Sequence, residues 1–140
     1  MVQVSGLVRE ALFGGLTDTD VAALLKQGQT VTFQTGELII RRGDHGDVMY
    51  IILSGMVEVI RRLGNEGPQF TRLALGEGEF FGELALLLEG QPRTANVIAI
   101  EPTTCLMLSR DELEQTVMRH PVIALSMLRV MSRRLRAVGP

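Results

Sequence analysis

The sequence predicts a mainly β domain, built as a sandwich or barrel of short strands with helices at both ends. Glycine is unevenly distributed, because 11 of the 15 glycines lie between Gly28 and Gly90 and none lies between Gln91 and Val138. Turns are therefore expected in the middle of the chain, and helix near its end. Short β-like runs separated by turn residues fill the middle, a pattern typical of sandwiches and barrels. These runs are Thr30–Phe33, Leu38–Arg41, Val48–Ser54, Met56–Arg61, Phe70–Leu75, Thr94–Ile100 and Thr103–Leu108.

The N-terminal part of the chain, over about residues 1–28, is expected to be helical. Thr17 is placed as an N-cap, and Asp20 adds a carboxylate to the first turn of the helix that follows. Gly28 ends this helix.

In the strand region, alternation supports the assignment, because Val57 and Val59 share one face of their run. Residues 63–68 (LGNEGP) are polar and contain Gly and Pro, so they are expected to form an exposed and mobile hairpin loop. The strands are expected to occupy residues 29–109.

Helices are expected again over residues 110–138. Ser109 and Glu112 have the spacing of a capping box. Pro121 suits the first turn of a last helix that runs toward Val138. The apolar positions of this helix are spaced 4, 3, 4 and 3, so the stripe can pack on its own domain or on a partner helix. The stripe consists of Ala124, Leu128, Met131, Leu135 and Val138.

The composition and charge of the chain exclude some classes of protein function. A chain of 140 residues with 46% hydrophobic and 21% charged residues is expected to fold as one domain over residues 1–140, and no apolar run reaches the ~20 residues of a membrane span. A net charge of -2 argues against a simple nucleic-acid binder. The charge is asymmetric, because residues 116–140 contain five arginines and no acid.

Cysteine and histidine exclude several kinds of site. Cys105 is the single cysteine, so internal disulfides, multi-cysteine zinc sites and cysteine-ligated iron–sulfur clusters are ruled out, and a reducing, cytoplasmic location is expected. A small core residue is the favoured interpretation of Cys105, with redox sensing as the alternative. His45 and His120 are too far apart for a paired metal site, so no metal is expected. The start of the chain does not resemble a secretory leader.

The segment from Gly78 to Val97 (GEFFGELALLLEGQPRTANV) contains the candidate ligand-binding groups. Gly82 permits a close backbone approach before a short run of helix formers, whose first N–H groups are free and lie at the positive end of the helix dipole. Glu83 offers a carboxylate at the same end. Arg93 offers a planar fork of donors that matches two phosphate oxygens, with the hydroxyl of Thr94 beside it. These groups suit a ligand with a phosphate and a sugar hydroxyl.

This segment closely resembles the phosphate-binding cassette of cyclic nucleotide-binding domains, as in the catabolite activator protein, kinase regulatory subunits and cyclic-nucleotide-gated channels. A second motif agrees with it, because residues 43–47 (GDHGD), followed by Tyr50 and Gly55, are similar to the strand-turn-strand signature of the family. The resemblance covers nearly the whole chain. It implies a jelly roll, also called a double-stranded β-helix, with a phosphate-binding cassette over residues 78–97 that contains a short helix, and a C-terminal helix that acts as a lid or dimer seam.

The resemblance also implies roles for single residues. Arg93 would pair with the exocyclic phosphate oxygens, Glu83 would accept from the ribose 2′-hydroxyl, and Thr94 would contact the phosphate and the purine edge. The ligand-binding residues implied are Phe81, Gly82, Glu83, Leu84, Ala85, Pro92, Arg93, Thr94 and Ala95, and the lid candidates are Met131, Arg134 and Leu135.

Simpler interpretations remain for some of these residues. Arg93 could instead form an ion pair with Glu83 or Glu89, and Glu83 could serve only as an acid in the first helical turn. The Gly and Asp residues of segment 43–47 are expected to form a turn and not to bind ligand. The arginines of the last helix could simply keep its exposed face soluble.

We therefore expect a sensor of a 3′,5′-cyclic purine nucleotide, with cAMP preferred over cGMP, which couples binding to movement of the last helix. Catalysis is not expected, and neither is a DNA-binding element within this chain. A homodimer through the last helix is an open alternative. The rival hypotheses are a module of the same fold that ignores nucleotides, a fragment of a transcription regulator, kinase or channel, and a cupin-like metalloenzyme.

Overall fold

Eight strands form the centre of the structure, which is a computed structural model describing residues 12–62 and 70–138, with side chains up to residue 136. Every predicted strand is present, with its ends within one residue of the prediction. The strands are β1 (Gln29–Phe33), β2 (Leu38–Ile40), β3 (Val48–Ser54), β4 (Val57–Arg62), β5 (Phe70–Leu75), β6 (Phe80–Phe81), β7 (Ala95–Ala99) and β8 (Thr103–Ser109).

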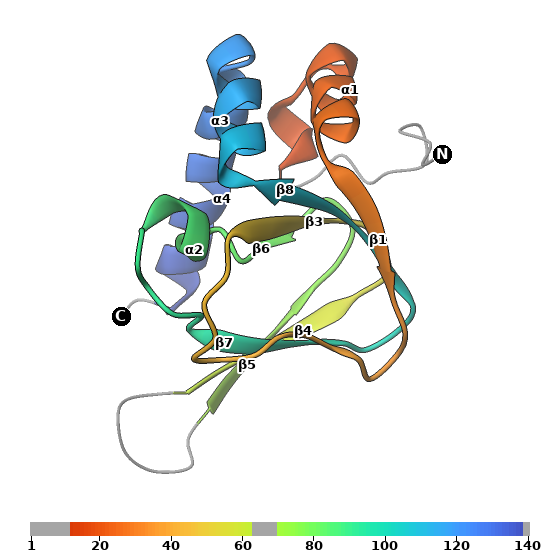
Figure 1. The fold of residues 1–140 in the computed structure, drawn as a ribbon, viewed down its shortest axis with the longest axis vertical. Coiled ribbons are helices and arrows are strands. Elements are labelled where there is room, and N and C mark those ends of the chain that lie inside the picture. The colour runs from red at the N-terminus through yellow and green to blue at the C-terminus, as the bar shows by residue number, and fades with distance from the viewer. Residues whose placement is uncertain (1–11, 63–69, 139–140) are drawn as a thin grey trace.

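The strands form two antiparallel four-stranded sheets that face each other (Figure 1). One sheet has the order β1-β8-β3-β6, and the other has the order β2-β7-β4-β5. Strands far apart in the sequence are neighbours in both sheets, as in a jelly roll. The predicted fold class is confirmed.

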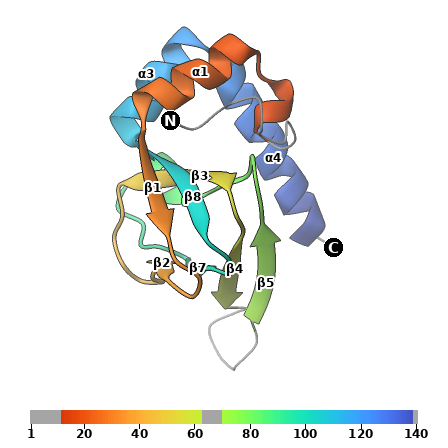
Figure 2. The same ribbon diagram turned by 90° about the vertical axis from the view of Figure 1, so that its right-hand side faces the viewer.

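Helices gather at one end of the roll and along one side of it (Figures 1 and 2). Ser109 and Glu112 form the predicted capping box, and Thr17 and Asp20 form a second one, in which the Asp20 carboxylate also accepts from the Thr17 N–H. Gly28 is the C-cap of the first helix, as predicted. The helices are a 3₁₀ turn η2 (Phe13–Gly15), α1 (Asp18–Gln27), the short α2 (Leu84–Leu87), α3 (Arg110–Arg119) and α4 (Val122–Val138).

The sheet β1-β8-β3-β6 is covered on both faces, so its central strand β3 is buried continuously from Met49 to Leu53. Met49 and Ile51 belong to a core shared with α1, α3 and α4. Tyr50 and Ile52 point the other way, into a second core between the two sheets. Burying apolar area on both faces is the largest favourable term in the folding of such a strand.

Helix α4 buries a different face from the stripe that its sequence suggested. Ile123, Met127 and Val130 are buried against the core, whereas Leu128 and Leu135 are 59% and 74% exposed. The buried Ser126 hydroxyl, on the core-facing side, donates to the carbonyl of Leu12 at 2.6 Å. Because α4 carries apolar residues on two faces, heptad spacing alone could not identify the face that packs on the domain.

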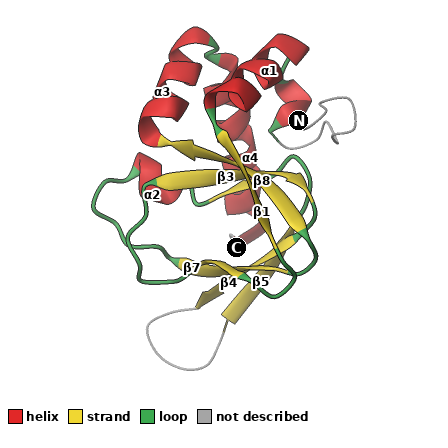
Figure 3. Ribbon diagram, turned by 45° about the vertical axis from the view of Figure 1, so that its right-hand side comes forward, coloured by secondary structure: helices red, strands yellow, loops and turns green. Residues whose placement is uncertain are grey.

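Two other expectations differ from the structure or fall outside it. β6 is a separate strand of two residues that pairs with β3, and it is not one of the runs that the sequence analysis assigned as strands. The hairpin loop expected over 63–68, which was also expected to be mobile, and the side chain of Val138 lie outside the described residues. Figure 3 shows the same arrangement coloured by secondary structure, with α1 and α3 at one end of the strands.

Candidate ligand-binding site

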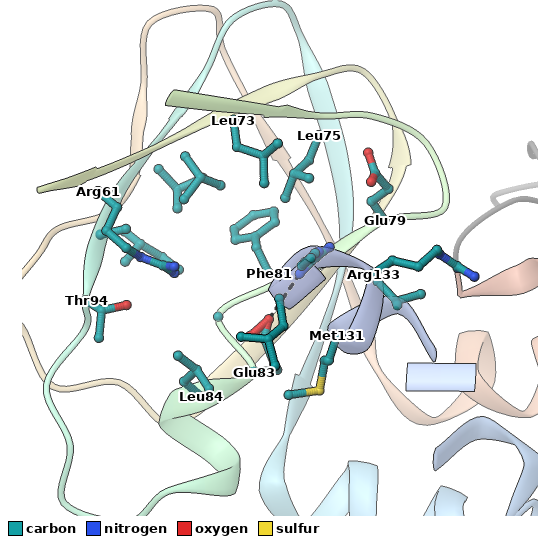
Figure 4. A pocket seen from close by; sticks show the side chains of 18 of the residues that line it. Arg61, Leu73, Leu75, Glu79, Phe81, Glu83, Leu84, Thr94, Met131 and Arg133 are labelled. Atoms are coloured by element: carbon teal, nitrogen blue, oxygen red, sulfur yellow. Dashed lines mark hydrogen bonds and ion pairs between the residues drawn. The ribbon is translucent and has the colours of Figure 1, made fainter. Parts of the chain in front are cut away.

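A cavity of about 1360 Å³ lies between the cassette, strands β4 and β5, and helix α4 (Figure 4). It is lined by every residue that the sequence analysis proposed for ligand binding and by all three lid candidates. The structure thus brings together residues from two separate segments, the cassette and the last helix. They are Phe81, Gly82, Glu83, Leu84, Ala85, Pro92, Arg93, Thr94 and Ala95, with Met131, Arg134 and Leu135.

Arg93 is held in place by main-chain carbonyl groups and not by an acidic side chain. Its Nη1 donates to the carbonyl of Gly82 at 3.0 Å, and its Nη2 donates to the carbonyl of Val48 at 2.8 Å. Only 8% of the residue is exposed. Burial lowers the pKa of the Arg93 guanidinium, although the nearby Tyr50 and Asp47 oppose that shift. The group remains a cation, since arginine stays charged in proteins.

The ion-pair alternative for Arg93 is therefore wrong. The Glu83 carboxylate pairs with Arg134, and the Glu89 carboxylate pairs with Arg110 at 2.7 Å. Arg93 thus forms no direct ion pair with either carboxylate, although the charge of Glu83 acts on it from within the site.

The turn over residues 43–47 supports Arg93 directly, which sequence reasoning missed. The Arg93 N–H donates to the carbonyl of Asp44 at 2.8 Å, and the Gly43 N–H donates to the carbonyl of Arg93 at 2.9 Å. This segment does form a turn, as expected. The sequence offered a sign of the added role, because both motifs of the resemblance occur together, but spacing could not show that they touch.

Two glycines pack against the guanidinium. A Cβ atom on Gly46 would lie 2.2 Å from Arg93 Nε, and one on Gly82 would lie 2.9 Å from Nη1. Gly82 also has a φ of 81°, in the left-handed region that favours glycine. Backbone thus encloses Arg93 so closely that any side chain at Gly46 would displace it.

Glu83 lies at the start of α2 and faces the cavity with 8% of its surface exposed. Burial raises the pKa of its carboxyl, and the charge of Arg134 is the largest of the opposing effects. Arg134 Nη1 lies 3.3 Å from Glu83 Oε1. A carboxylate in this setting is an acceptor for a donor that enters the cavity, such as a hydroxyl.

Arg134 connects α4 to the floor of the site. Besides Glu83, it contacts Phe80, because Nη2 donates to the Phe80 carbonyl and the guanidinium lies 4.6 Å from the centre of the ring. Its Nε is buried and has no hydrogen-bond partner among the described residues. Of the three lid candidates, Arg134 is the one bonded to the site, whereas Leu135 is largely exposed.

The opposite wall of the cavity is apolar and comes from β4, β5 and β7. Val59, Leu73 and Val97 are cross-strand partners, so their side chains share one face, and all of them line the cavity. Phe81 adds an aromatic ring that is stacked on Tyr50 with centroids 5.1 Å apart. The sequence analysis named Phe81 for the site and placed Val59 on one face of its strand, but it did not assign Val59, Leu73 or Val97 to the cavity.

A family model described as the cyclic nucleotide-binding domain matches residues 30–120. The chain belongs to this family. It is 36% identical over 130 residues to a "CRP-like cAMP-activated global transcriptional regulator" of Mycobacterium tuberculosis, covering 93% of this chain and 57% of that relative. It is 37% identical over 126 residues to the "Cyclic AMP receptor protein" of Thermus thermophilus, covering 89% and 57%.

Solved structures of the family agree with the fold. The catabolite activator protein of Thermus thermophilus superposes with a TM-score of 0.79 at 34% identity, over 91% of this chain and 59% of that one. The chain therefore spans less than two thirds of the length of these relatives. Like them, it carries a cyclic nucleotide-binding regulatory domain.

The remaining candidate groups do not form a second site. Burial raises the pKa of the Cys105 thiol to about 12, so the thiol stays protonated, which favours the core interpretation. The His120 ring is hydrogen-bonded to the Asp20 carboxylate, with Nδ1 2.8 Å from Oδ1. Among residues 12–62 and 70–138, no cluster of His, Cys, Asp or Glu could hold a metal ion. No helix in this part of the chain is long and apolar enough to cross a membrane.

The enclosure of Arg93 predicts a strong interaction between Gly46 and Arg93. Gly46→Ala should lower the free energy of unfolding by about 1–3 kcal/mol, the usual cost of overpacking, because its methyl group would overlap the guanidinium. In an Arg93→Ala background, where the space is free, the same substitution should cost much less. Urea unfolding of the four proteins measures this coupling. Gly76→Ala is the control, since its Cβ would meet nothing closer than 3.9 Å. Equal costs in both backgrounds would contradict the enclosure.

Proposed function

We propose that this domain binds a 3′,5′-cyclic purine nucleotide in the cavity and transmits its occupancy through α4. The observation that carries the proposal is that the buried cation Arg93 and the buried carboxylate Glu83 line the same cavity, opposite an apolar wall. A phosphate, a ribose hydroxyl and a flat base require these three surfaces. The family that the chain belongs to supports the same ligand class.

Arg93 has the donors that a cyclic phosphate needs. The carbonyls of Gly82 and Val48 occupy one N–H each at Nη1 and Nη2, and a guanidinium carries five such donors. The remaining N–H groups can bind exocyclic phosphate oxygens, with backbone N–H groups of the segment 82–85 beside them. Charge-assisted hydrogen bonds are worth about 1.5–3 kcal/mol each, so a few of them approach the roughly 8 kcal/mol of micromolar binding.

Glu83 would accept the ribose 2′-hydroxyl, and Thr94 would contact the phosphate. The purine would lie on the wall formed by Val59, Leu73 and Val97. We prefer cAMP to cGMP, because the relatives from Mycobacterium and Thermus are named for cyclic AMP.

Helix α4 is coupled to this site through Glu83, which binds Arg134 in the structure. A ribose hydroxyl that bonds to the same carboxylate changes the interaction of Glu83 with Arg134 and therefore favours one position of α4 over another. Because coupling is reciprocal, displacing α4 changes the affinity for the nucleotide equally. We place the domain within a longer regulator, and its action is binding and not catalysis.

Replacing Arg93 tests the ligand and its anchor together. Arg93→Ala should weaken the binding of cAMP and cGMP by about 100-fold, since more than one charge-assisted bond is lost. Arg93→Lys keeps the charge but not the planar fork of donors, so its affinity should lie between those of the unaltered protein and Arg93→Ala. Isothermal titration calorimetry measures the affinities, and Arg119→Ala, at the exposed end of α3, is the charge-matched control. If the unaltered protein bound neither nucleotide, or if binding survived Arg93→Ala undiminished, the proposal would be wrong.

Movement of α4 can be followed by fluorescence, because the chain contains no tryptophan. In Leu135→Trp the single indole replaces an exposed side chain on α4. Its emission should change as nucleotide is added and then reach a plateau. The midpoint of this change should agree with the dissociation constant measured by calorimetry. Adding Arg134→Met should reduce this change at saturating nucleotide, because the contact with Glu83 is lost. An unchanged emission, or an equal change without Arg134, would contradict coupling through this residue.

We further propose that α4 pairs with α4 of a second copy. Leu128 and Leu135 are exposed and seven residues apart, which is the spacing of a coiled-coil seam. Sedimentation equilibrium should therefore give twice the chain mass of 15.4 kDa, and the double substitution Leu128→Ser, Leu135→Ser should give a monomer. Met118→Ser, at an 81% exposed position on α3, controls for the loss of an exposed apolar side chain. A monomeric unaltered protein across the concentration range would rule out the pairing.

A further inference from the structure

Arg61 is a cation in the cavity that the roles assigned so far do not use. It lies near the end of β4 and lines the cavity. Figure 4 shows its side chain extending from the strand toward the interior of the cavity. The sequence analysis had counted it only as the end of a strand.

Strand register explains why Arg61, although exposed, lies on the cavity side of its strand. Its partners across the sheet are Thr71 on β5 and Ala95 on β7, and both of these residues also line the cavity. Two residues earlier on β4, Val59 lies on the same face, within the apolar wall. Arg61 therefore continues this wall with a charged group, beside the hydroxyls of Thr71 and Thr94.

The guanidinium of Arg61 has no partner among the described residues, in contrast to three of the arginines that line the same cavity. Arg93 donates to two carbonyls, Arg134 donates to Glu83 and Phe80, and Arg72 is paired with Glu58 at 2.7 Å. No hydrogen bond or ion pair of the Arg61 guanidinium occurs among residues 12–62 and 70–138. Its charge nevertheless reaches the site, because it contributes to lowering the pKa of Glu83 against the larger effect of burial.

We propose that Arg61 is a specificity-determining residue that favours guanine over adenine in this cavity. The inference rests on the proposed function, since it assumes that a purine lies on the wall that Arg61 extends. Thr71 and Thr94 add hydroxyls at the same end of the cavity, so this end can bind a polar base edge.

The chemistry of the two bases gives the direction of the effect. Guanine presents O6 and N7 as adjacent acceptors, and an arginine fork binds both at once. Adenine presents N7 as an acceptor beside the N6 amino group, which is a donor. A guanidinium has donors only, so it gains one hydrogen bond with adenine and meets a second donor. Arg61 thus opposes whatever preference for adenine the rest of the cavity has.

The test compares affinity ratios. Titration calorimetry would give the dissociation constants of cAMP, cGMP and 3′,5′-cyclic inosine monophosphate for the unaltered protein and for Arg61→Met. The inosine nucleotide keeps O6 and N7 but lacks the guanine amino group, so it isolates the edge that Arg61 would bind. The matched control is Arg133→Met, which removes an arginine that lines the same cavity from the exposed side of α4 and to which we assign no role.

Arg61→Met should weaken cGMP and the inosine nucleotide by about tenfold relative to cAMP, and the control should leave the ratio unchanged. Retained binding of cAMP would show that the variant is folded. An unchanged ratio, an equal loss for all three nucleotides, or an equal shift in Arg133→Met would overturn the role of Arg61 and leave the proposed function intact. Failure of the unaltered protein to bind any of the three would overturn both.

Discussion

The burial of one guanidinium organises much of this structure. A charged group removed from water must be hydrogen-bonded or it costs several kcal/mol, so Arg93 is stable only where acceptors surround it. The carbonyls of Val48, at the start of β3, and of Gly82, just after β6, provide them, and the turn over 43–47 binds the Arg93 main chain. These segments are distant in sequence. The cation therefore joins the two motifs of the family into one site, and the glycines at 46 and 82 follow from the space that it occupies.

Most of the fold could be predicted from local patterns in the sequence. Strand ends, both helix caps and the stop at Gly28 depend on residues close together in the chain, and these predictions agree with the structure. β6 could not be predicted as a strand, because two residues are too few for a period to be visible. The buried face of α4 could not be predicted either, since Leu128 and Ile123 are equally apolar and only the tertiary structure decides between them.

The sequence predicted which cassette residues line the cavity, but it did not predict which residues they contact. The cassette motif identified the residues that line one side of the cavity, from Phe81 to Ala95. The other side depends on strand register, which brings Val59, Leu73 and Arg61 opposite the cassette. Pairings over such distances depend on how the roll closes. The same is true of the partners of Glu83 and Arg93. An ion pair between these two residues was one of the simpler alternatives, but Glu83 binds Arg134 and Arg93 binds main-chain carbonyls.

The shortest strand, β6, belongs to both cores of the structure. Phe80 and Phe81 are consecutive, so their side chains leave β6 on opposite faces, and each one enters a different core. Phe81 lines the cavity, and Phe80 supports the guanidinium of Arg134 on α4. The two residues of this strand therefore contact the cavity and α4 at the same time. β6 thus joins the inside of the roll to the helix outside it through a single pair of neighbouring side chains.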